Sequence, residues 1–507
     1  MKAVLSKSNS YLLDKYSIKS DPLNNKNIMR RAGKEIAQFI IENIYNVFNQ
    51  KIIVLAGPGD NGGDAIIAHS YLIKYCSNST LILFNKAQVE TWYFKEFVKP
   101  YSSYLLYDDK YVFDENNYYL DAIFGIGLNR KINGKYKTSI NALKRCPNII
   151  SIDIPTGIYS DSGKSAGAFI NSKLTLSISN YKIGCFFNEG LEAVGQLINL
   201  DVGLRPYEKM ITPDCYLLES NDILKFWPKY SKSIYKYSKG TLFVIAGSIG
   251  YTGACILSIK AAIKTGTGIV KMIVPKSLNS LFESLSIETI TISVDDNNVG
   301  YFNDSNIDEI ISNIKLANTI LFGPGLRSDK HSADWKSQIL KSINTNLILD
   351  ASGFESLILK KNNLNDLPAS TILTPHYSEF CQIFGFDITY VIQNTLESVK
   401  KIIPLLNKRI LVLKGPITII VTSEAEIYLI NIGSRLLATA GTGDVLAGII
   451  SSLVSQGISL DNAALLGTYL HSKCSNIYKN KIASNGLIAS DLINIIPLAV
   501  EKLINEN

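Results

Sequence analysis

The segment Thr439–Asp444 (TAGTGD) joins a glycine turn to an acidic residue, directly before an apolar helical run, Val445–Val454. Backbone N–H groups of such a turn converge on an anion, and the positive end of the helix dipole adds to the attraction. A carboxylate is poorly suited to holding phosphate, but Asp444 could take a proton from a hydroxyl that attacks a phosphoryl group. The segment therefore predicts a phosphoryl-transfer site. An ordinary helix entry capped by aspartate is the alternative.

Three polar side chains of the second half follow segments that are typical of buried strands. Lys414 follows one such segment, so its amine can reach a nucleotide phosphate, and Thr418 adds a hydroxyl close by. His376 follows another, after Thr374–Pro375. A cation, a histidine, an aspartate and an anion-binding turn form a phosphoryl-transfer set, although the chain has neither a Walker A motif nor a protein-kinase signature.

Two histidines also have structural explanations. A capping or packing role is the alternative for His376. For His471, which lies next to Leu470 on a predicted helix, we favour the structural role over a functional one.

Acidic residues also follow strands in the first half of the chain. The loop 57–64 (GPGDNGGD) holds an asparagine and two acids, which suits a cation or hydroxyl groups better than phosphate alone. It is not the GxGxxG dinucleotide fingerprint. Asp121 and Asp153 lie close to the ends of two later strands. Each aspartate alone is explained equally well as a loop cap, but together at one sheet edge they favour a binding site.

The elements that would position these first-half residues alternate between short apolar strands and amphipathic helices. This alternation predicts βαβ units and a mostly parallel sheet, whose ligands bind beyond the carboxyl ends of the strands. The polar loops 57–64, 125–134 and 155–163 would then meet at one edge. The expected strands are Lys51–Ala56, Leu81–Phe84, Tyr119–Phe124 and Ile149–Ile154, with a helix from about Asp64 to Tyr75.

A second α/β pattern begins at Gly240, and no internal repeat links it to the first. The basic, aromatic segment Phe226–Lys239 is interpreted as the domain connection, with a nucleic-acid patch as the weaker alternative. The expected strands of the second pattern are Thr241–Ala246, Ile269–Val274, Thr319–Phe322, Asn346–Leu349, Thr371–Leu373 and Arg409–Leu413, with a helix at Ala254–Lys264.

Composition limits the classes of protein that need to be considered. At 507 residues, with 46% hydrophobic and 19% charged residues, the chain suits about two to four soluble globular domains. A net charge of +7 does not by itself imply nucleic acid. The seven cysteines lack metal-type spacing, which indicates reduced thiols. Without a signal-peptide core or a membrane-length apolar run, we expect a cytoplasmic protein that does not bind membranes.

Five segments of the second half together carry a specific family resemblance. In chain order they are 246–254 (AGSIGYTGA), 323–326 (GPGL), 373–376 (LTPH), 413–415 (LKG) and 438–448 (ATAGTGDVLAG). Their order closely resembles the ribokinase-like family and, within it, the NAD(P)H-hydrate dehydratase branch, over a domain at residues 222–507. The resemblance implies that a hydroxyl gained by the nicotinamide ring is phosphorylated and then eliminated as phosphate, which restores the ring double bond.

The same resemblance implies roles for individual residues. Asp444 would be the catalytic base and a substrate contact, with the amides of 440–443 around the transferred phosphate. The phosphoryl donor would be ADP with Mg²⁺, giving AMP. The other substrate contacts would be Ala254, Gly325 and His376, and the nucleotide would be bound by Lys414, Gly415, Pro416, Ile417, Thr418 and Gly443. Ser352 and Arg327 depart from the residues usual in this branch.

The first half resembles the NAD(P)H-hydrate epimerase family, a Rossmann-like three-layer fold, over about residues 1–205 of a domain at 1–215. Asp153 would contact the hydrate and act as acid or base at its C6 centre, and Asn61, Asp121 and Thr156 would hold K⁺. Asp60, Ala65 and Thr156 stand where Asn, Gly and Ser are usual. Substrate binding would also involve Asp60, Asn61, Gly62, Gly63, Asp64, Gly125, Ile126, Gly127, Leu128, Asn129, Arg130 and Lys131.

The two resemblances are chemically complementary. Hydration at C6 gives R and S epimers, the dehydratase would accept the S form, and an epimerase on the same chain would recover the R form. We therefore expect a bifunctional isomerase and lyase that repairs hydrated NADH and NADPH, and homo-oligomer formation is left open. One alternative is a ribokinase-class small-molecule kinase fused to a non-catalytic cofactor-binding domain. The other is an inactive first domain, which Asp60 motivates.

Overall fold

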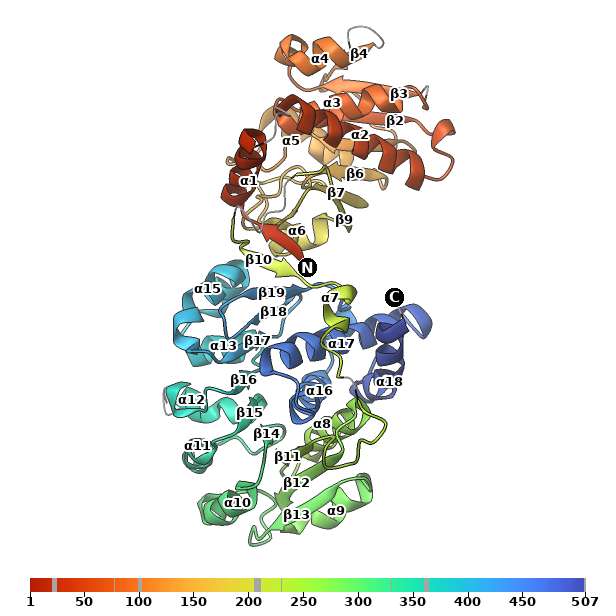
Figure 1. The fold of residues 1–507 in the computed structure, drawn as a ribbon. Helices are drawn as coiled ribbons and strands as arrows, with labels where there is room; N and C mark the ends of the chain where they lie inside the picture. The colour runs from red at the N-terminus through yellow and green to blue at the C-terminus, as the bar shows by residue number, and fades with distance from the viewer. Residues whose placement is uncertain are drawn as a thin grey trace. The chain divides into compact units, whose positions relative to one another are not determined.

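The computed structural model describes residues 1–20, 25–76, 78–98, 103–204, 211–228, 230–329, 331–359 and 364–505. Within them the chain forms two compact units, Lys2–Tyr216 and Leu217–Asn507, with Met1 counted in the second (Figure 1).

The first unit is built on a parallel sheet with the order β4-β3-β2-β5-β6-β7-β9. Because the chain runs outward from β2 in one direction and then from β5 in the other, the strand order reverses between these two central strands. This is the order of the dinucleotide-binding fold, which places ligands at that reversal. The strands are β2 Ile52–Ala56, β3 Ser79–Leu83, β4 Tyr104–Leu106, β5 Tyr118–Ala122, β6 Ile149–Ile152, β7 Leu174–Ile178 and β9 Gln196–Leu200.

Successive apolar side chains along the strands point to opposite faces of this sheet, and both faces are buried. Val54 packs on one face against α2 and α3, while Leu55 packs on the other face with α5. Period-two burial of this kind is what a sheet covered by helices on both sides requires. The predicted three-layer, mostly parallel arrangement is confirmed. The helices are α1 Lys7–Ser20, α2 Asn25–Asn43, α3 Asp60–Leu72, α4 Trp92–Phe97, α5 Gly134–Leu143 and α6 Asn188–Ala193.

Some first-half boundaries differ from those that the sequence predicts. The helix after β2 begins at Asp60 instead of about Asp64, because Gly59 is its N-cap and Asp60 already lies in its first turn. Residues 60–64 are therefore helical. Strands β5 and β6 each end two residues early, and Asp153 directly after β6 has a positive φ of 69°, which is incompatible with an extended strand.

The start of the first unit is tied to its far end. Strand β1, Lys2–Leu5, pairs in parallel with β8, Tyr181–Lys182, so that Leu5 lies opposite Lys182. Helix α1 follows at once, and the backbone N–H of Ser6 donates to Asp214 Oδ2 at 2.8 Å. Helix α1 is therefore held in place by contacts on its N-terminal side.

The second unit contains a sheet with the order β13-β12-β11-β14-β15-β16-β17-β18-β19. It is parallel up to β17 and antiparallel through β18 and β19, and its order also reverses, between β11 and β14. The strands are β11 Thr241–Ile245, β12 Ile269–Pro275, β13 Ile290–Val294, β14 Thr319–Phe322, β15 Asn346–Leu349, β16 Thr371–Leu373, β17 Ile410–Leu413, β18 Thr418–Val421 and β19 Ile427–Ile430.

Helices cover both faces of this second sheet (Figure 1). One layer contains α8, α16, α17 and α18, which pack on one another, and the other contains α10 to α13 and α15. The segment 226–239 belongs to this unit, and its residue 229 lies outside the described residues. The helices are α7 Ser220–Leu224, α8 Thr252–Thr265, α9 Asn279–Leu285, α10 Ile307–Ile314, α11 Ser332–Ser342, α12 Glu355–Leu359, α13 Tyr377–Phe384, α14 Ile388–Gln393, α15 Thr395–Leu406, α16 Thr442–Ser455, α17 Leu460–Lys481 and α18 Ala489–Asn505.

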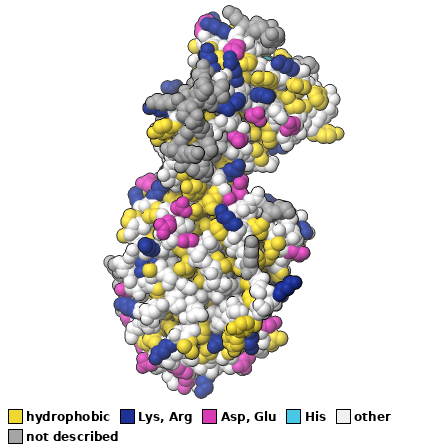
Figure 2. All heavy atoms as spheres, in the orientation of Figure 1, with side chains coloured by type: hydrophobic (Ala, Val, Ile, Leu, Met, Phe, Trp, Pro, Cys, Tyr) yellow, Lys and Arg dark blue, Asp and Glu magenta, His cyan; other side chains and the backbone are white. Residues whose placement is uncertain are grey.

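The surface of the second unit mixes both signs of charge. On the face drawn in Figure 2, lysine and arginine side chains are interspersed with aspartate and glutamate. Among the described residues, no helix has the length and the apolar character needed to span a bilayer.

Two candidate active sites

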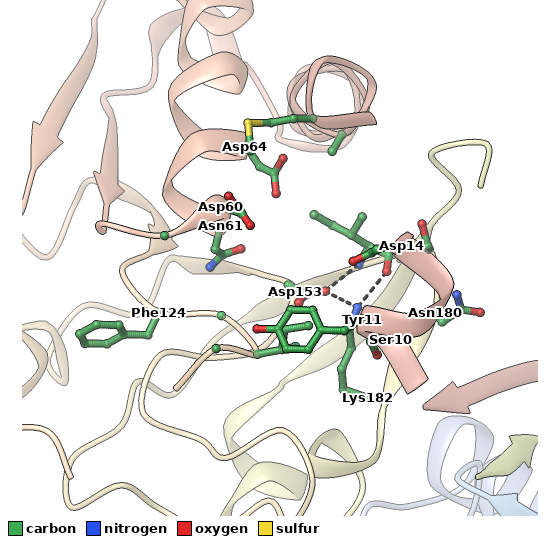
Figure 3. Close-up of a pocket in the computed structure, with 18 of the residues that line it drawn as sticks. Ser10, Tyr11, Asp14, Asp60, Asn61, Asp64, Phe124, Asp153, Asn180 and Lys182 are labelled. Carbon is green, nitrogen blue, oxygen red and sulfur yellow. Dashed lines mark hydrogen bonds and ion pairs between the residues drawn. The ribbon is translucent and has the colours of Figure 1, made fainter. Parts of the chain in front are cut away.

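The first unit has a cavity of about 860 Å³ where its strand order reverses (Figure 3). Loops that follow β2, β5 and β6 contribute to its lining, as expected for the carboxyl edge of a parallel sheet. The predicted residues that line it are Asp60, Asn61, Asp64, Gly125, Ile126, Gly127, Leu128, Asn129, Arg130 and Asp153.

Three predicted substrate contacts lie outside the lining of this cavity. Gly62 and Gly63 are buried in α3, where a Cβ on Gly62 would lie 1.9 Å from the carbonyl oxygen of Gly57. A Cβ on Gly63 would lie 2.9 Å from the sulfur of Met29. The two glycines therefore allow α3 to pack closely, and Lys131 is exposed at the end of its loop.

Asp153 is held at the cavity by its backbone and by a buried cation. Its N–H donates to Leu176 O at 2.7 Å, and its carboxylate accepts from Ile178 N at 3.3 Å. Lys182 Nζ forms an ion pair with the same carboxylate, and both side chains are about nine-tenths buried or more. A left-handed backbone is uncommon outside glycine, although aspartate tolerates it better than most residues. The carboxylate is thus fixed against a permanent positive charge.

Two further carboxyl groups face the same cavity with shifted acidities (Figure 3). Burial raises the pKa of Asp64 well above its usual range, and the charges of Asp153 and Asp60 add to the effect. Burial likewise raises the pKa of Asp14, to about 6. Neutral and ionised carboxyl groups in one cavity are the usual arrangement for acid–base chemistry.

Sequence reasoning missed the cavity residues that come from outside the three loops. Tyr11 and Asp14 are on α1, and Lys182 is on β8. Asp14 lies in a helix whose polar and apolar residues show little periodicity, so no local pattern places it at a sheet edge.

Asp121 is buried behind this cavity rather than in its lining. One carboxylate oxygen accepts from Thr156 Oγ1 at 2.7 Å and from Ile123 N at 3.3 Å. The other accepts from Ser151 Oγ at 2.6 Å and from Thr156 N at 3.0 Å. Because a carboxylate offers about four acceptor positions, these bonds occupy all of them. Asp121 therefore shapes the loop around Thr156 and supplies a buried carboxyl group.

Asn61 lies in the first turn of α3, and both its Oδ1 and its Nδ2 are buried without a hydrogen-bond partner among the described residues. A Cβ on Gly125 would lie 3.1 Å from its Cγ and 3.4 Å from its Nδ2. On the neighbouring loops, Thr156 Oγ1 after β6 donates to the carbonyl oxygen of Phe124 after β5 at 3.2 Å. Buried amides are normally satisfied, so Asn61 has an open acceptor oxygen that could bind a cation such as K⁺.

The second site begins at the N-terminus of α16. Gly441 is the N-cap with a φ of 85°, and Asp444 lies in the first helical turn. A Cβ on Gly441 would lie 2.6 Å from Leu257 Cδ1 and 3.1 Å from Ala489 Cβ, so both conformation and space require glycine. The turn thereby packs against α8 and α18. Thr442 N donates to Thr439 O at 3.4 Å, and the first turn of a helix lacks intrahelical acceptors for its remaining N–H groups, as an anion site requires.

Lys414 stands opposite this turn but is not free. Its Nζ lies 2.7 Å from Asp350 Oδ1, and the same oxygen accepts from Thr374 Oγ1 at 2.7 Å. The Nζ would also lie 3.3 Å from a Cβ on Gly443, which places the ammonium group at the glycine turn. The ends of β15, β16 and β17 therefore meet the N-terminus of α16.

Charges around Lys414 change the acidity of Asp444. The pKa of Asp444 is raised to about 7, chiefly by burial and also by the charges of Asp350 and Glu379, while Lys414 opposes them. Burial also raises the pKa of Glu379, and although burial lowers that of Lys414, Asp350 and Glu379 raise it overall. A carboxyl group that titrates near neutrality is suited to act as a base.

His376 lies beside this cluster as a helix cap. Its Nδ1 accepts from Glu379 N at 3.2 Å, and the backbone N–H of His376 donates to Glu379 Oε2 at 2.8 Å. This is a reciprocal capping box at the start of α13, so the capping alternative describes the geometry. The ring remains 55% exposed, which leaves it accessible to a ligand.

Ala254 and Gly325 meet where the second sheet reverses its order. Gly325 has a φ of 64°, and a Cβ there would lie 2.3 Å from Tyr251 O and 3.1 Å from Ala254 Cβ. Ser248 Oγ donates to Gly325 O at 2.8 Å, which joins the loops after β11 and β14. Gly415 and Pro416 are exposed in the turn before β18, whereas Ile417 is buried and Thr418 begins that strand.

Asp350, Thr374 and Glu379 were not among the predicted contacts. Their contribution depends on the pairing of β15, β16 and β17, which brings distant parts of the chain together. His471 is buried on α17, and burial lowers its pKa to about 4. The structural role of His471 stays a prediction.

Two open, mostly parallel sheets, each with acid–base groups at the carboxyl ends of its parallel strands, define a two-unit α/β enzyme. A family model described as NAD(P)H-hydrate dehydratase matches residues 242–498, and one described as YjeF-related protein N-terminus matches residues 25–184. The chain belongs to the family of bifunctional NAD(P)H-hydrate repair enzymes. The resemblance, the bifunctional isomerase and lyase function and the fold class are thereby confirmed, and the alternative of a ribokinase-class small-molecule kinase fused to a non-catalytic domain is set aside.

Named relatives cover nearly the whole chain. The bifunctional NAD(P)H-hydrate repair enzyme Nnr of Dictyoglomus turgidum is 31% identical over 496 residues, covering 94% of both chains. The enzyme of the same name from Thermofilum pendens is 26% identical over 502 residues, covering 97% of this chain and 94% of its own.

Solved structures agree on the fold of the second unit. The ADP/ATP-dependent NAD(P)H-hydrate dehydratase from Bacillus subtilis, co-crystallised with ATP and Mg²⁺, aligns with a TM-score of 0.50 at 22% identity, covering 57% of this chain and 99% of its own. A ribokinase-like superfamily protein from Enterococcus faecalis gives 0.50 at 22% identity, covering 58% and 98%.

Proposed function

We propose that the first unit, about residues 1–215, is the epimerase and that the second, about residues 222–507, is the dehydratase. The observation that carries this assignment is the presence of a separate acid–base group at each sheet edge, Asp153 in one unit and Asp444 in the other. The positions of the two family matches within the two units support it.

In the dehydratase, Asp444 takes the proton of the C6 hydroxyl as its oxygen attacks the terminal phosphoryl group of the nucleotide. The N–H groups of 440–443 and the ammonium of Lys414 offset the charge on the transferred group. Phosphate then leaves C6 with the C6–O bonding electron pair. C5 loses a proton to solvent, and the electrons of the broken C5–H bond form the ring double bond between C5 and C6. Phosphate is a far better leaving group than hydroxide, so the nucleotide drives an elimination that water loss alone would make slow.

The nucleotide would be held by Lys414, Thr418 and the turn between them, and Ala254, Gly325 and His376 would contact the hydrate. ADP is our proposed donor, giving AMP and phosphate. The name of the Bacillus subtilis protein, which mentions ADP and ATP, supports this nucleotide class. Mg²⁺ would accompany the nucleotide and neutralise part of its phosphate charge.

In the epimerase, the cavity beside Asp153 would bind the hydrate, and Asp153 would exchange protons with the C6 hydroxyl. K⁺ would lie near Asn61 and Thr156, with Asp121 positioning Thr156 from behind. Such an ion would fix the loops after β2 and β5. Asp60 lines the same cavity, where it would meet the hydrate.

The deciding experiment supplies hydrated NADH as a mixture of both epimers, together with ADP. Full recovery of the absorbance of reduced nicotinamide, with stoichiometric AMP and phosphate, is expected. A stable phosphorylated alcohol would contradict the elimination. Persistence of the R epimer in a mixture that consumes the S epimer would contradict an active first unit. Replacing ADP with ATP determines the donor.

We also propose a cytoplasmic location, which is supported by the observation that all seven cysteines are free and buried.

A further inference from the structure

Helix α1 carries a carboxyl group, Asp14, into the cavity of the first unit. Figure 3 shows Asp14 on this helix, while Asp153 approaches from the sheet edge. Within the described part of the chain, the Asp14 carboxyl makes no hydrogen bond or ion pair. Asp153, in contrast, is paired with Lys182. The two carboxyl groups of one cavity therefore have different surroundings.

The N-terminal side of helix α1, the helix that carries Asp14, is held by several contacts. Strand β1 pairs with β8 so that Leu5 lies opposite Lys182, the residue that holds Asp153. Asn9 Nδ2 then donates to Asp214 Oδ2 at 2.8 Å, and Lys7 N donates to Asp161 Oδ1 at 2.6 Å. Helix α1 is thus fastened to the same strand that orients Asp153.

The surroundings of Asp14 favour its protonated form. Burial is the largest cause that raises the pKa of Asp14 to about 6, Asp153 and Asp60 add to it, and Lys182 opposes it. Asp153 is instead engaged in an ion pair with the ammonium of Lys182. The cavity thus places a carboxyl group that can donate a proton on α1, opposite a second carboxyl group at the sheet edge.

We propose that Asp14 is a second catalytic acid–base group of the epimerisation, acting from α1 while Asp153 acts from the sheet edge; this inference rests on the proposed function of the first unit. Asp14 gives its proton to the C6 hydroxyl oxygen. The C6–O bond breaks, its electron pair leaves with water, and the lone pair of N1 forms an N1=C6 double bond.

Water then adds to the other face of C6, and the electrons of the N1=C6 double bond return to N1. Asp153 takes the proton that this water loses. One proton has moved from Asp14 to Asp153, and exchange with solvent restores both groups. The substrate gains and loses one water, so its composition is unchanged and its configuration at C6 is inverted.

The test uses the full-length chain and the isolated R epimer. Asp14→Asn, which keeps the size of the side chain, should lower the kcat of epimerisation by about 10²- to 10⁴-fold, with KM within threefold. The dehydratase activity on the S epimer, measured in the same sample, should not change. Leu12→Ala, an exposed position on the same helix, is the matched control and should epimerise at the wild-type rate.

The pH profile separates an acid from a merely structural side chain. Because Asp14 must be protonated, kcat of the wild type should fall as the pH rises through the pKa of Asp14, and Asp14→Asn should lack this limb. Asp14→Glu should retain it at an intermediate rate. The other titratable groups that line this cavity are Asp60 and Asp64 on α3, Arg130 after β5, Asp153 and Lys182, with Tyr11 and Lys15 on α1.

Oxygen exchange tests the bond that breaks. In H₂¹⁸O, each wild-type epimerisation should place label at C6, and an active enzyme that leaves the original oxygen in place overturns the proposal even if the variants fail to fold. Unchanged kcat in Asp14→Asn, or a change in KM alone, also overturns it. Absence of epimerisation by the wild-type chain would instead contradict the proposed function of the unit.

Discussion

The Nζ of Lys414 lies 2.7 Å from Oδ1 of Asp350, so an ion pair bridges the ends of strands β17 and β15 at the N-terminus of α16. Asp350 is almost fully buried, with 2% of its side chain exposed, whereas Lys414 retains 20%. The pair thus orients an ammonium group that can still meet an incoming phosphate, while the carboxylate beneath it keeps that ammonium protonated.

Removing the cation should therefore affect both stability and turnover. Lys414→Met leaves the buried Asp350 carboxylate unpaired, which we expect to cost about 3–5 kcal/mol in the free energy of unfolding and to suppress dehydration. The double variant Lys414→Met/Asp350→Asn should recover most of the stability but none of the activity. Thermal unfolding and the initial rate of NADH recovery check this, and a double variant with restored turnover would contradict it.

Asp444 should control dehydration alone. In Asp444→Asn we expect the rate to fall by about 10²- to 10⁴-fold, while epimerisation proceeds normally. In the wild type, a base with a pKa of about 7 makes the phosphorylation rate rise as the pH increases through that value. Single-turnover rates between pH 5 and pH 9 provide the measurement. Simultaneous loss of both activities in a folded variant would argue against separate sites.

The same carboxyl group should reduce stability in alkaline solution. Its pKa is raised from 3.8 to about 7 in the folded chain, so its stabilising proton is fully bound below pH 4 and is lost as the pH rises through 7. Asp444→Asn removes this loss. We expect the variant to exceed the wild type by on the order of 2–4 kcal/mol at pH 8 and to match it near pH 4. Denaturant unfolding at both pH values is the check.

Potassium should matter only to the first unit. Replacing K⁺ with tetramethylammonium, which has no vacant site for oxygen ligands, should slow epimerisation and leave dehydration of the S epimer unchanged. Asn61→Ala should remove the response of epimerisation to K⁺, because its carbonyl oxygen is the unpartnered group beside the loop. Titration of both activities with KCl distinguishes this from a general salt effect, which would change them together.

Two glycines of one loop should respond very differently to the same substitution. A Cβ on Gly57 would lie 1.7 Å from the carbonyl oxygen of Ile123, whereas nothing lies within 4 Å of one on Gly59. Gly57→Ala therefore forces β2 and the loop after β5 apart, and we expect a cost of about 3 kcal/mol or more. Gly59→Ala should stay within about 1 kcal/mol. Equal unfolding temperatures for the two variants would contradict the close contact between Gly57 and Ile123.

The sequence predicted most strands because buried parallel strands produce continuous apolar runs, as Ile52–Ala56 does. It misplaced the start of α3, since glycines at 62 and 63 read as a loop although they serve close helix packing. Local patterns do not show which distant backbone approaches a glycine.

The same limit applies to the residues of the two sites. Asp153 and Asp444 stand beside recognisable motifs, so their neighbourhoods were predictable. Asp14 and Lys182 reach the cavity only because β1 pairs with β8, a long-range contact without a local sequence signal. Likewise, the sequence does not decide between a capping and a ligand-binding role for His376, because the capping contact with Glu379 depends on where α13 begins.

The reversal of strand order in both sheets has a consequence for redesign. In the first unit, a Cβ on Gly57 after β2 would meet the carbonyl oxygen of Ile123 after β5. In the second unit, Ser248 Oγ after β11 donates to Gly325 O after β14. The two loops at each reversal are therefore matched to each other, so a redesign that exchanges one of them should exchange its neighbour as well.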